Sequence, residues 1–271
     1  MNNPIQSKQI IILFSFCLVT VLLSCSPPSK IRRPEKPVPW KIEEIDKEFK
    51  KRALIFKQGI IEGSAKLFYP DGYKQKIRFL IHWSLENKEP KVRVVGFGPF
   101  GITAFEFLAI DGAAYLMVPS KKTTYAALPK ELTAHKGALI AARQFMQIIN
   151  PWSQLEQIKI DSELKGLITG IYEVDGFKSI ITFNPVNLMP IQLIGPEIEV
   201  NYSDGLYLQD ENIVYPKKIY INLKHRSMTL EIKIKKVQPS PNSFDKKLFD
   251  KSRFLQFPVK PWQELFQNKS S

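Results

Sequence analysis

The chain has 271 residues, of which 44% are apolar and 24% are charged, so it can build the core of one large domain or two small ones. The net charge of +13 favours anionic partners such as nucleic acid, anionic lipid or anionic glycolipid. Both cysteines, Cys17 and Cys25, lie near the N-terminus, which excludes a disulfide or a thiolate metal site in the rest of the chain.

The N-terminal segment has the pattern of a secretory signal. Lys8 precedes an apolar run from Ile10 to Leu23, which is shorter than the about 20 residues of a membrane-spanning helix. Residues 22–25, Leu-Leu-Ser-Cys, closely resemble the lipobox of bacterial lipoproteins. The resemblance implies that residues 1–24 are a signal peptide that is removed, and that Cys25 carries diacylglycerol and an N-acyl chain. The alternative is a plain signal with a coincidental cysteine.

Residues 25–39 are expected to form a proline-rich tether. Five prolines after Cys25 favour extended polyproline II, which at about 3.1 Å per residue reaches roughly 40 Å. Export argues against nucleic acid as the partner. Because Lys8 is the one charged residue of the signal, the mature chain keeps a net charge of +12. That charge favours anionic lipid or glycolipid, and a merely solvated basic surface is the alternative.

Residues 40–56 predict an amphipathic helix. Ile42, Ile45, Phe49 and Phe56 follow helical spacing, and charged residues occupy the other side. We expect this helix to lie on a sheet, with a membrane surface as the alternative.

From Gly59 the apolar period changes to 2, which predicts strands joined by short turns in an antiparallel meander. A second helix, residues 135–149, divides the meander, and Asp-Gly turns are predicted at 111–112, 175–176 and 204–205. The fold class is therefore mainly β (α+β), with one curved antiparallel sheet of about ten strands. The predicted strands are residues 61–68, 77–85, 91–95, 102–110, 113–118, 123–128, 158–164, 167–174, 178–183, 191–193, 197–202, 219–223 and 227–235.

The order of these parts resembles the LolB/LolA-like family of outer-membrane lipoproteins and lipoprotein carriers. The resemblance covers about residues 40 to 237 and rests on the lipobox, the helices and meanders, Gly63, and Gly98-Pro99-Phe100-Gly101 in a hairpin. It implies an open half-barrel over residues 40–258, whose helices cover or plug the concave face, followed by a tail at 259–271. The chain departs from the family in its length, its charge, and Ile55 or Phe56 where the family has a tryptophan, which indicates a divergent relative.

The resemblance places Phe100 where the family has an apolar residue that enters the membrane, so Phe97, Pro99 and Phe100 are candidate membrane contacts. Glycines and a proline make a tip without regular ladder hydrogen bonds. An exposed phenylalanine gains about 1.5–3 kcal/mol on entering an apolar medium. The alternative is that Phe97 and Phe100 pack under their own sheet.

An acyl chain or other apolar ligand is expected on the concave face. The candidate ligand contacts are alternate residues of the clearest strands: Phe79, Ile81, Trp83, Leu230 and Ile232. The alternative for these residues is a closed, well-packed core.

The sequence lacks the motifs of known catalytic and metal sites. The histidines, His82, His135 and His225, have no metal-binding spacing, and no nucleophile elbow or phosphate-binding glycine loop occurs. We therefore expect no enzyme, no metal and no cofactor. Residues 244–257 alternate basic and aromatic side chains, which suits an interfacial helix or packing across an open end of the sheet.

These observations predict a monomeric lipoprotein anchored to the outer membrane on its periplasmic side. It would bind an acyl chain in lipoprotein localisation or insertion, or in envelope lipid handling, with a periplasmic carrier protein as a further partner. Ser26 after the lipid-bearing cysteine fits outer-membrane sorting by the same resemblance. The alternative is a non-transporting envelope scaffold or sensor that binds a protein partner through the same fold.

Overall fold

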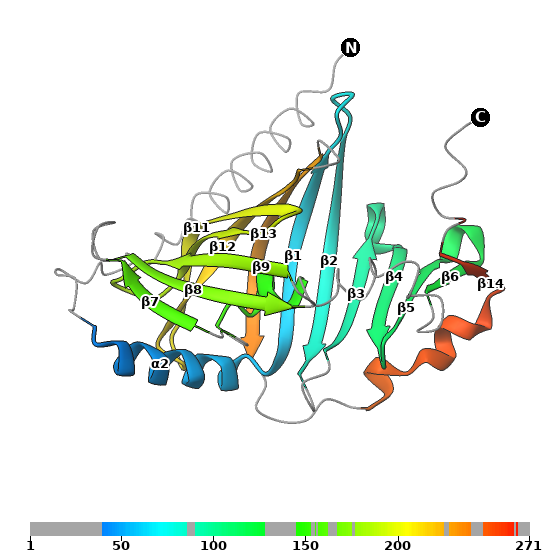
Figure 1. Cartoon of the computed structure of the whole chain (residues 1–271). Coiled ribbons are helices and arrows are strands. Elements are labelled where there is room, and N and C mark those ends of the chain that lie inside the picture. Colours follow the sequence, from blue (N-terminus) through cyan, green and yellow to red (C-terminus); the bar gives the residue numbers. More distant parts are fainter. Residues whose placement is uncertain are drawn as a thin grey trace, which may run out of the picture. The chain divides into compact units, whose positions relative to one another are not determined.

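Fourteen strands form one continuous sheet in the order β14-β6-β5-β4-β3-β2-β1-β13-β12-β11-β10-β9-β8-β7 (Figure 1). Neighbouring strands are antiparallel, except that β14 pairs with β6 in parallel. The computed structural model describes residues 40–85, 90–127, 145–152, 155, 157–161, 167–174, 177–224, 228–239, 246–262 and 264. The predicted signal peptide, Cys25, the tether and residues 135–144 of the second predicted helix lie outside these residues.

The predicted curved, unclosed antiparallel sheet is confirmed. The total of about ten strands was too low, because the thirteen predicted ranges all contribute strands to this one sheet. Thirteen strands overlap the predicted ranges, and β14 was not predicted. The first half contains β1 (Gln58–Phe68), β2 (Lys74–Ser84), β3 (Lys91–Phe97), β4 (Thr103–Ile110), β5 (Ala113–Val118) and β6 (Thr123–Ala127). The second half contains β7 (Gln157–Asp161), β8 (Leu167–Val174), β9 (Phe177–Phe183), β10 (Pro190–Ile194), β11 (Ile198–Leu208), β12 (Ile213–Leu223), β13 (Met228–Pro239) and β14 (Val259–Pro261).

Strand alternation gives the sheet one apolar, concave face. In β2, the side chains of Phe79, Ile81 and Trp83 are buried in the main core, because alternate residues of a strand point to the same face. Gly63 of β1 lies opposite Phe79, and a Cβ atom there would be 2.7 Å from the Phe79 ring. The glycine therefore lets this ring lie against the strand.

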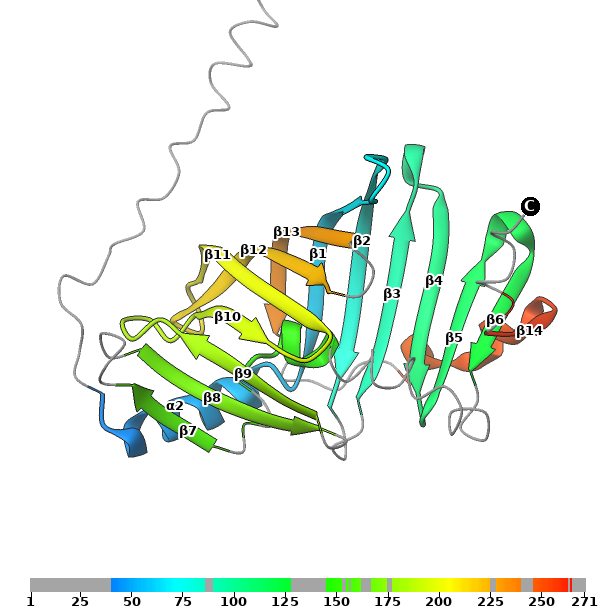
Figure 2. The same ribbon diagram turned by 45° about the horizontal axis from the view of Figure 1, so that its top comes forward.

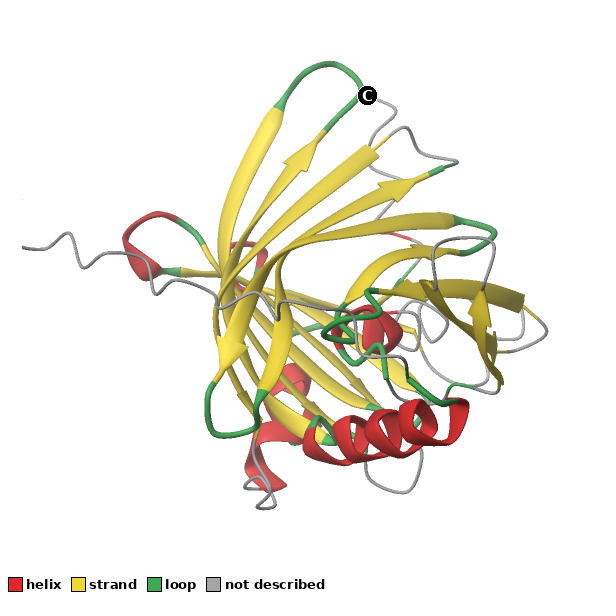
Figure 3. Cartoon of the chain, turned by 90° about the vertical axis from the view of Figure 1, so that its left-hand side faces the viewer, coloured by secondary structure: helices red, strands yellow, loops and turns green. Residues whose placement is uncertain are grey.

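Two helical segments pack against the concave side, and Figure 3 shows the sheet curving around the short inner one while the long helix lies along the lower edge of the sheet. Helix α2 (Ile42–Ile55) buries Ile45 and Phe49 in the main core, as its amphipathic pattern predicted. Its first turn is capped by Glu44, which accepts a hydrogen bond from the backbone N–H of Lys41 at 3.1 Å. Residues 145–149 form the other helical segment.

The C-terminal segment covers the opposite face of the sheet. Two short 3₁₀ helices, η4 (Lys246–Phe249) and η5 (Lys251–Gln256), run beside β3 to β6 (orange in Figure 2), and Phe249 and Phe254 are buried there with Leu108. Arg253 also forms an ion pair with Glu106, at 2.7 Å. Of the two readings of this segment, packing onto the sheet is the one that the structure supports.

The compact unit Pro37–Ser271 contains every buried core residue that the structure describes, from Ile45 to Phe254. A unit with its own core can fold without the segment that precedes it. In the part of the chain that the structure describes, no helix has the length and apolar character to cross a membrane.

The predicted turn at Asp204-Gly205 is wrong, because both residues lie inside β11. Asp204 adopts a left-handed φ of 53°, which Asp tolerates better than most residues, and its carboxylate pairs with Lys218 of β12 at 2.7 Å. Gly205 lies opposite Pro216, so the strand continues through an irregular point instead of reversing.

Candidate functional site

The concave face is occupied by a plug, which we define as residues 145–152. Three tyrosines of the surrounding strands donate hydrogen bonds to backbone carbonyls of the plug. Tyr215 donates to Ile149 at 2.6 Å, Tyr202 donates to Ile148 at 3.5 Å, and Tyr172 donates to Pro151. Burial raises the pKa of all three hydroxyls well above the usual value, so they remain protonated donors at neutral pH.

The backbone carbonyl of Phe56 joins the sheet, the end of the first helix and the plug. It accepts hydrogen bonds from Nε1 of Trp83 at 2.8 Å and from Nδ2 of Asn150 at 2.9 Å. The Phe56 ring lies 5.0 Å from the Trp152 ring and 5.2 Å from the Tyr215 ring. This aromatic packing makes the plug part of the hydrophobic core.

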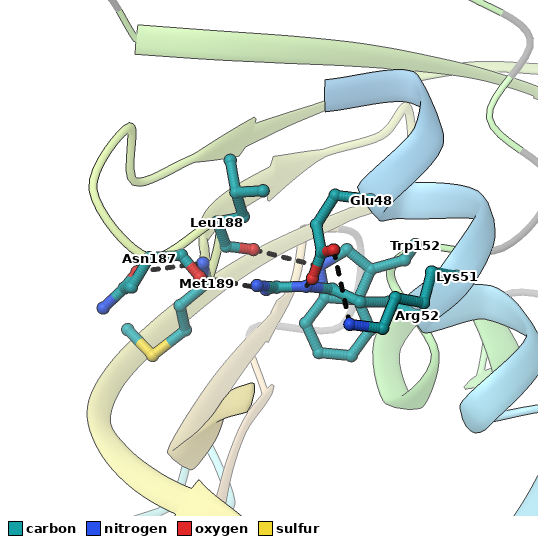
Figure 4. A network of polar contacts seen from close by, with 7 residues as sticks. All are labelled: Glu48, Lys51, Arg52, Trp152, Asn187, Leu188 and Met189. Carbon is teal, nitrogen blue, oxygen red and sulfur yellow. Dashed lines mark hydrogen bonds and ion pairs between the residues drawn. The ribbon is translucent and has the colours of Figure 1, made fainter. Parts of the chain in front are cut away.

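Arg52 links α2 to the plug and to the β9–β10 loop (Figure 4). Its Nε donates to Glu48 at 2.9 Å, its Nη1 donates to the carbonyl of Asn187 at 2.9 Å, and its guanidinium lies 5.5 Å from the centre of the Trp152 ring. Trp152 in turn donates to the carbonyl of Leu188 at 2.9 Å. Burial lowers the pKa of Arg52, and the hydrogen bond and charge of Glu48 oppose that shift.

The candidate ligand residues lie at different depths on the concave face. Phe79, Ile81, Trp83 and Ile232 are buried in the main core, and Leu230 is half-buried against it. Trp83 is fully buried and its indole N–H is already bonded to Phe56. The structure therefore brings all five to one face, where the deeper four are part of the packed core and Leu230 packs against it.

Exposure along this face rises toward the end of the sheet that carries the β1–β2 and β3–β4 turns, which we call the hairpin end. On β2, Trp83 is fully buried, Ile77 is half-buried and Gln75 is exposed. Leu67 of β1 lies directly opposite Leu230 of β13, and both are half-buried. Leu67, Ile77 and Leu230 thus form a partly exposed apolar mouth that continues from the core.

The β3–β4 turn presents the apolar tip that the sequence predicted. Pro99–Gly101 form the single 3₁₀ turn η2, in which Phe100 is 100% exposed, and Ile102 beside it is 69% exposed. Phe100 has a φ of 58°, in the left-handed region that non-glycine residues rarely occupy. Pro99 is also exposed, whereas Phe97 is half-buried on β3. The alternative that Phe100 packs under its own sheet is wrong.

Sequence reasoning missed the residues that hold the plug. Tyr172, Tyr202 and Tyr215 occupy inward positions of three different strands, and a buried tyrosine needs a hydrogen-bond partner. That pattern could have suggested that a chain segment enters the concave face and offers its backbone carbonyls to these tyrosines. It could not have identified the carbonyls of residues 148–151, because the pairing depends on how the chain returns into the concave face.

Catalytic geometry is not evident around these groups. No group of three or more His, Cys, Asp or Glu side chains gathers to hold a metal ion within the described ranges. His82 is buried on β2, and burial followed by the charge of Arg93 lowers its pKa. The described residues instead form an apolar face that is packed against the plug and is partly exposed at the hairpin end.

Neither a protein-family model nor a curated protein sequence matches the chain. Solved structures match it over most of its length. An outer-membrane lipoprotein-sorting protein domain from Vibrio parahaemolyticus has a TM-score of 0.53 and 11% identity over 78% of this chain and 97% of its own. A LolA-superfamily protein from Nitrosomonas europaea has a TM-score of 0.50 and 10% identity over 77% and 98%. A DUF1329-family protein from Desulfovibrio piger has a TM-score of 0.54 and 8% identity over 79% and 98%.

These identities are too low to transfer residue roles, but the TM-scores and the coverage show that the architecture is similar. The resemblance drawn from the sequence is confirmed at the level of the fold. The chain therefore has an open, curved β-sheet fold like that of the lipoprotein-sorting domain and the LolA-superfamily protein, with a sequence that has diverged far from both.

Proposed function

We propose that the protein binds the acyl chain of a lipoprotein or lipid on its concave face and exchanges it with a membrane. The chain would act on the periplasmic side of the outer membrane, anchored through Cys25 and the tether of residues 25–39. Its fold, shared with a lipoprotein-sorting domain and a LolA-superfamily protein, supports a carrier or acceptor rather than an enzyme.

The observation that carries this proposal is the continuous apolar surface from the core to the hairpin end. Phe79 and Ile232 lie at its deep end, and Ile77, Leu67 and Leu230 form the partly exposed mouth. An acyl chain gains about 0.8 kcal/mol for each methylene that it buries. A few methylenes at the mouth already give useful affinity, and movement of the plug would extend the site inward.

Phe100 supports the membrane side of the proposal. A fully exposed phenylalanine at a tight turn, with exposed Ile102 beside it, is an apolar tip of the kind that enters lipid. The exposed tip lies at the same end of the sheet as the mouth. Lipid could therefore pass between the membrane and the concave face without crossing the polar outer surface.

The test uses residues 37–271, which contain the whole buried core, and a fatty acid carrying a fluorescence quencher. Quenching of the buried Trp83 and Trp152 should report entry of the acyl chain, and Leu230→Lys at the mouth should weaken it about 10-fold, because a charge is costly in an apolar site. The matched control is Ile180→Lys, at a side chain of β9 that is 51% exposed. Equal quenching in all three proteins, or no quenching in any, would contradict the proposal and favour a protein-binding scaffold.

The anchor is tested separately in the full chain. Cys25→Ser should abolish incorporation of labelled fatty acid and release the protein from the membrane fraction. Normal incorporation in this variant would contradict the assignment of Cys25, and it would leave the acyl-binding proposal untouched.

A further inference from the structure

A basic groove of about 720 Å³ lies on the sheet beside the β3–β4 tip. Its lining includes five cations, which are Lys76, Arg78, Lys217, Lys233 and Lys235. Among the described residues that line it, Glu62 is the one carboxylate. We call these residues, together with Ser64 and Phe97, the basic groove.

Strand register explains why the charges converge. Lys233 of β13 lies opposite Ser64 of β1, and Ser64 lies opposite Arg78 of β2. Arg78 in turn lies opposite Phe97 of β3. Directly opposed residues of neighbouring strands point to the same face. Lys233 and Arg78 therefore stand on either side of the small Ser64, on the face opposite to the buried Phe79.

The acidic groups nearby neutralise only part of this charge. Glu62 pairs with Lys235 at 3.1 Å, and Glu231 pairs with Lys233 at 3.4 Å. Among the residues that the structure describes, no ion pair involves Lys76, Arg78 or Lys217. Asp204, which pairs with Lys218, also interacts electrostatically with Lys217 and Lys233. The five cations still outnumber these carboxylates, which favours an anionic ligand, and the guanidinium of Arg78 can bind a phosphate through two hydrogen bonds.

The basic groove opens directly beside the apolar tip. Gly101 of the tip also lines the groove, and a Cβ atom at Gly101 would lie 3.6 Å from Nη2 of Arg78. Phe100 is the residue before Gly101 and is fully exposed. When Phe100 enters the acyl region of a leaflet, Arg78 beside Gly101 would therefore lie close to the headgroups, where cations are favoured.

We propose that the basic groove binds the phosphate groups of anionic lipid headgroups while Phe100 lies in the leaflet. The inference rests on the proposed membrane contact, and it specifies that the lipids contacted are anionic. The positive charge of the groove favours a phosphate ligand. The neighbouring Phe97 and Phe100 favour the phosphate of a membrane lipid over a phosphate free in solution. The groove would hold the hairpin end against an anionic surface and orient the mouth toward it.

The experiment measures sedimentation of the 37–271 protein with vesicles of phosphatidylcholine, alone or mixed with phosphatidylglycerol. The test variant combines Lys76→Gln with Arg78→Gln, and a second variant combines Lys217→Gln with Lys233→Gln on the other wall. The matched control combines Lys47→Gln with Lys57→Gln, which removes two exposed lysines on and after α2. Thermal unfolding confirms that each variant is folded.

Each groove variant should bind mixed vesicles about 30-fold more weakly than the parent, because each cation near an anionic surface contributes about a 5-fold factor. Binding to phosphatidylcholine alone should not change, and the control should lose much less. Equal losses in the groove and control variants would overturn the proposal, because the charge effect would then be diffuse. Full competition by glycerol phosphate at the same phosphate concentration would also overturn it, in favour of a soluble anion.

The groove and the tip are distinguishable in the same assay. Phe100→Asn should weaken binding to both kinds of vesicle, whereas the groove variants act on the mixed vesicles alone. If Phe100→Asn has no effect and the groove variants do, the insertion model fails and the headgroup site stands. The reverse result rejects the groove and keeps the insertion.

Discussion

The indole nitrogen of Trp83 donates a hydrogen bond of 2.8 Å to the backbone carbonyl of Phe56, just after the end of α2. Both side chains are fully buried, and the Phe56 ring also contacts the plug residue Trp152. The contact therefore couples the centre of the sheet to the first helix and, through that helix, to the plug.

Trp83→Phe should lower the free energy of unfolding by about 2–3 kcal/mol, because it removes a buried hydrogen bond and leaves a cavity. Urea unfolding followed by circular dichroism measures the change. Trp262→Phe is the control, since Trp262 is only half-buried and should lose less than about 1 kcal/mol. Similar losses in the free energy of unfolding of the two variants would show that the Trp83–Phe56 contact does not contribute more to stability than an ordinary half-buried tryptophan.

The three plug tyrosines predict a loss of stability at alkaline pH. Burial raises the pKa of Tyr172, Tyr202 and Tyr215 in the folded protein, whereas in the unfolded chain a tyrosine titrates near pH 10. Their contribution is fully present below about pH 10. Above it the unfolded chain releases protons that the folded protein retains, so stability falls by about 1.4 kcal/mol per pH unit for each tyrosine.

Urea unfolding between pH 8 and 11 measures this slope. Tyr215→Phe should reduce it by about one third, because one of three titrating groups is gone. The variant should also admit the quencher fatty acid more readily, since the plug loses its bond to Ile149. Tyr73→Phe, at a side chain that is 61% exposed, should leave the slope unchanged. A slope that Tyr215→Phe does not alter would mean that other groups control the alkaline transition.

Alternation made most of the sheet predictable from the sequence. Phe79, Ile81 and Trp83 occupy alternate positions, and one face of a half-buried strand must carry them. The strand β14 was not predictable, because its three residues include Pro261 and have no alternation of their own. It forms because β6 offers an edge, which is a property of the folded sheet.

The apolar tip at Phe100 and the plug also differ in how far the sequence predicts them. The exposure of Phe100 follows from local composition, since Pro99 and two flanking glycines make a turn that cannot shield a side chain. The plug depends on contacts between residues that are distant in sequence, such as Tyr215 with Ile149 and Arg52 with Asn187. The basic groove likewise requires the register of β13, β1 and β2, which single-strand patterns do not specify.

Arg52 should contribute more to stability than its charged neighbours on α2. Arg52→Gln removes the bonds to Glu48 and to the Asn187 carbonyl and the contact with Trp152, and we expect a loss of about 2 kcal/mol in the free energy of unfolding. Lys51→Gln is the matched control. Lys51 is 3.8 Å from the same Glu48 but is exposed, so its loss should stay below about 0.5 kcal/mol. Equal effects would show that the three-way junction of α2, the plug and the β9–β10 loop is not an energetic unit.

The last prediction separates folding from membrane contact at Phe100. Phe100 adopts a φ of 58° and a ψ of 16°, a backbone conformation that asparagine tolerates better than phenylalanine. Its side chain is fully exposed, so the folded protein gains no packing from the ring. Phe100→Asn should therefore keep or raise the melting temperature.

Vesicle binding of the same variant should fall about 10- to 100-fold, because moving an exposed phenyl group from water into lipid strengthens binding by about this factor. A strained turn that carries an aromatic ring without packing benefit is expected where the ring serves a function. Ile180→Asn is the control, because it removes an apolar side chain that is also exposed but lies on β9. If Phe100→Asn unfolds the protein, or if the control loses as much vesicle binding, the ring is not a specific membrane contact. A stable Phe100→Asn variant with weak vesicle binding is the outcome that a membrane-entering tip requires.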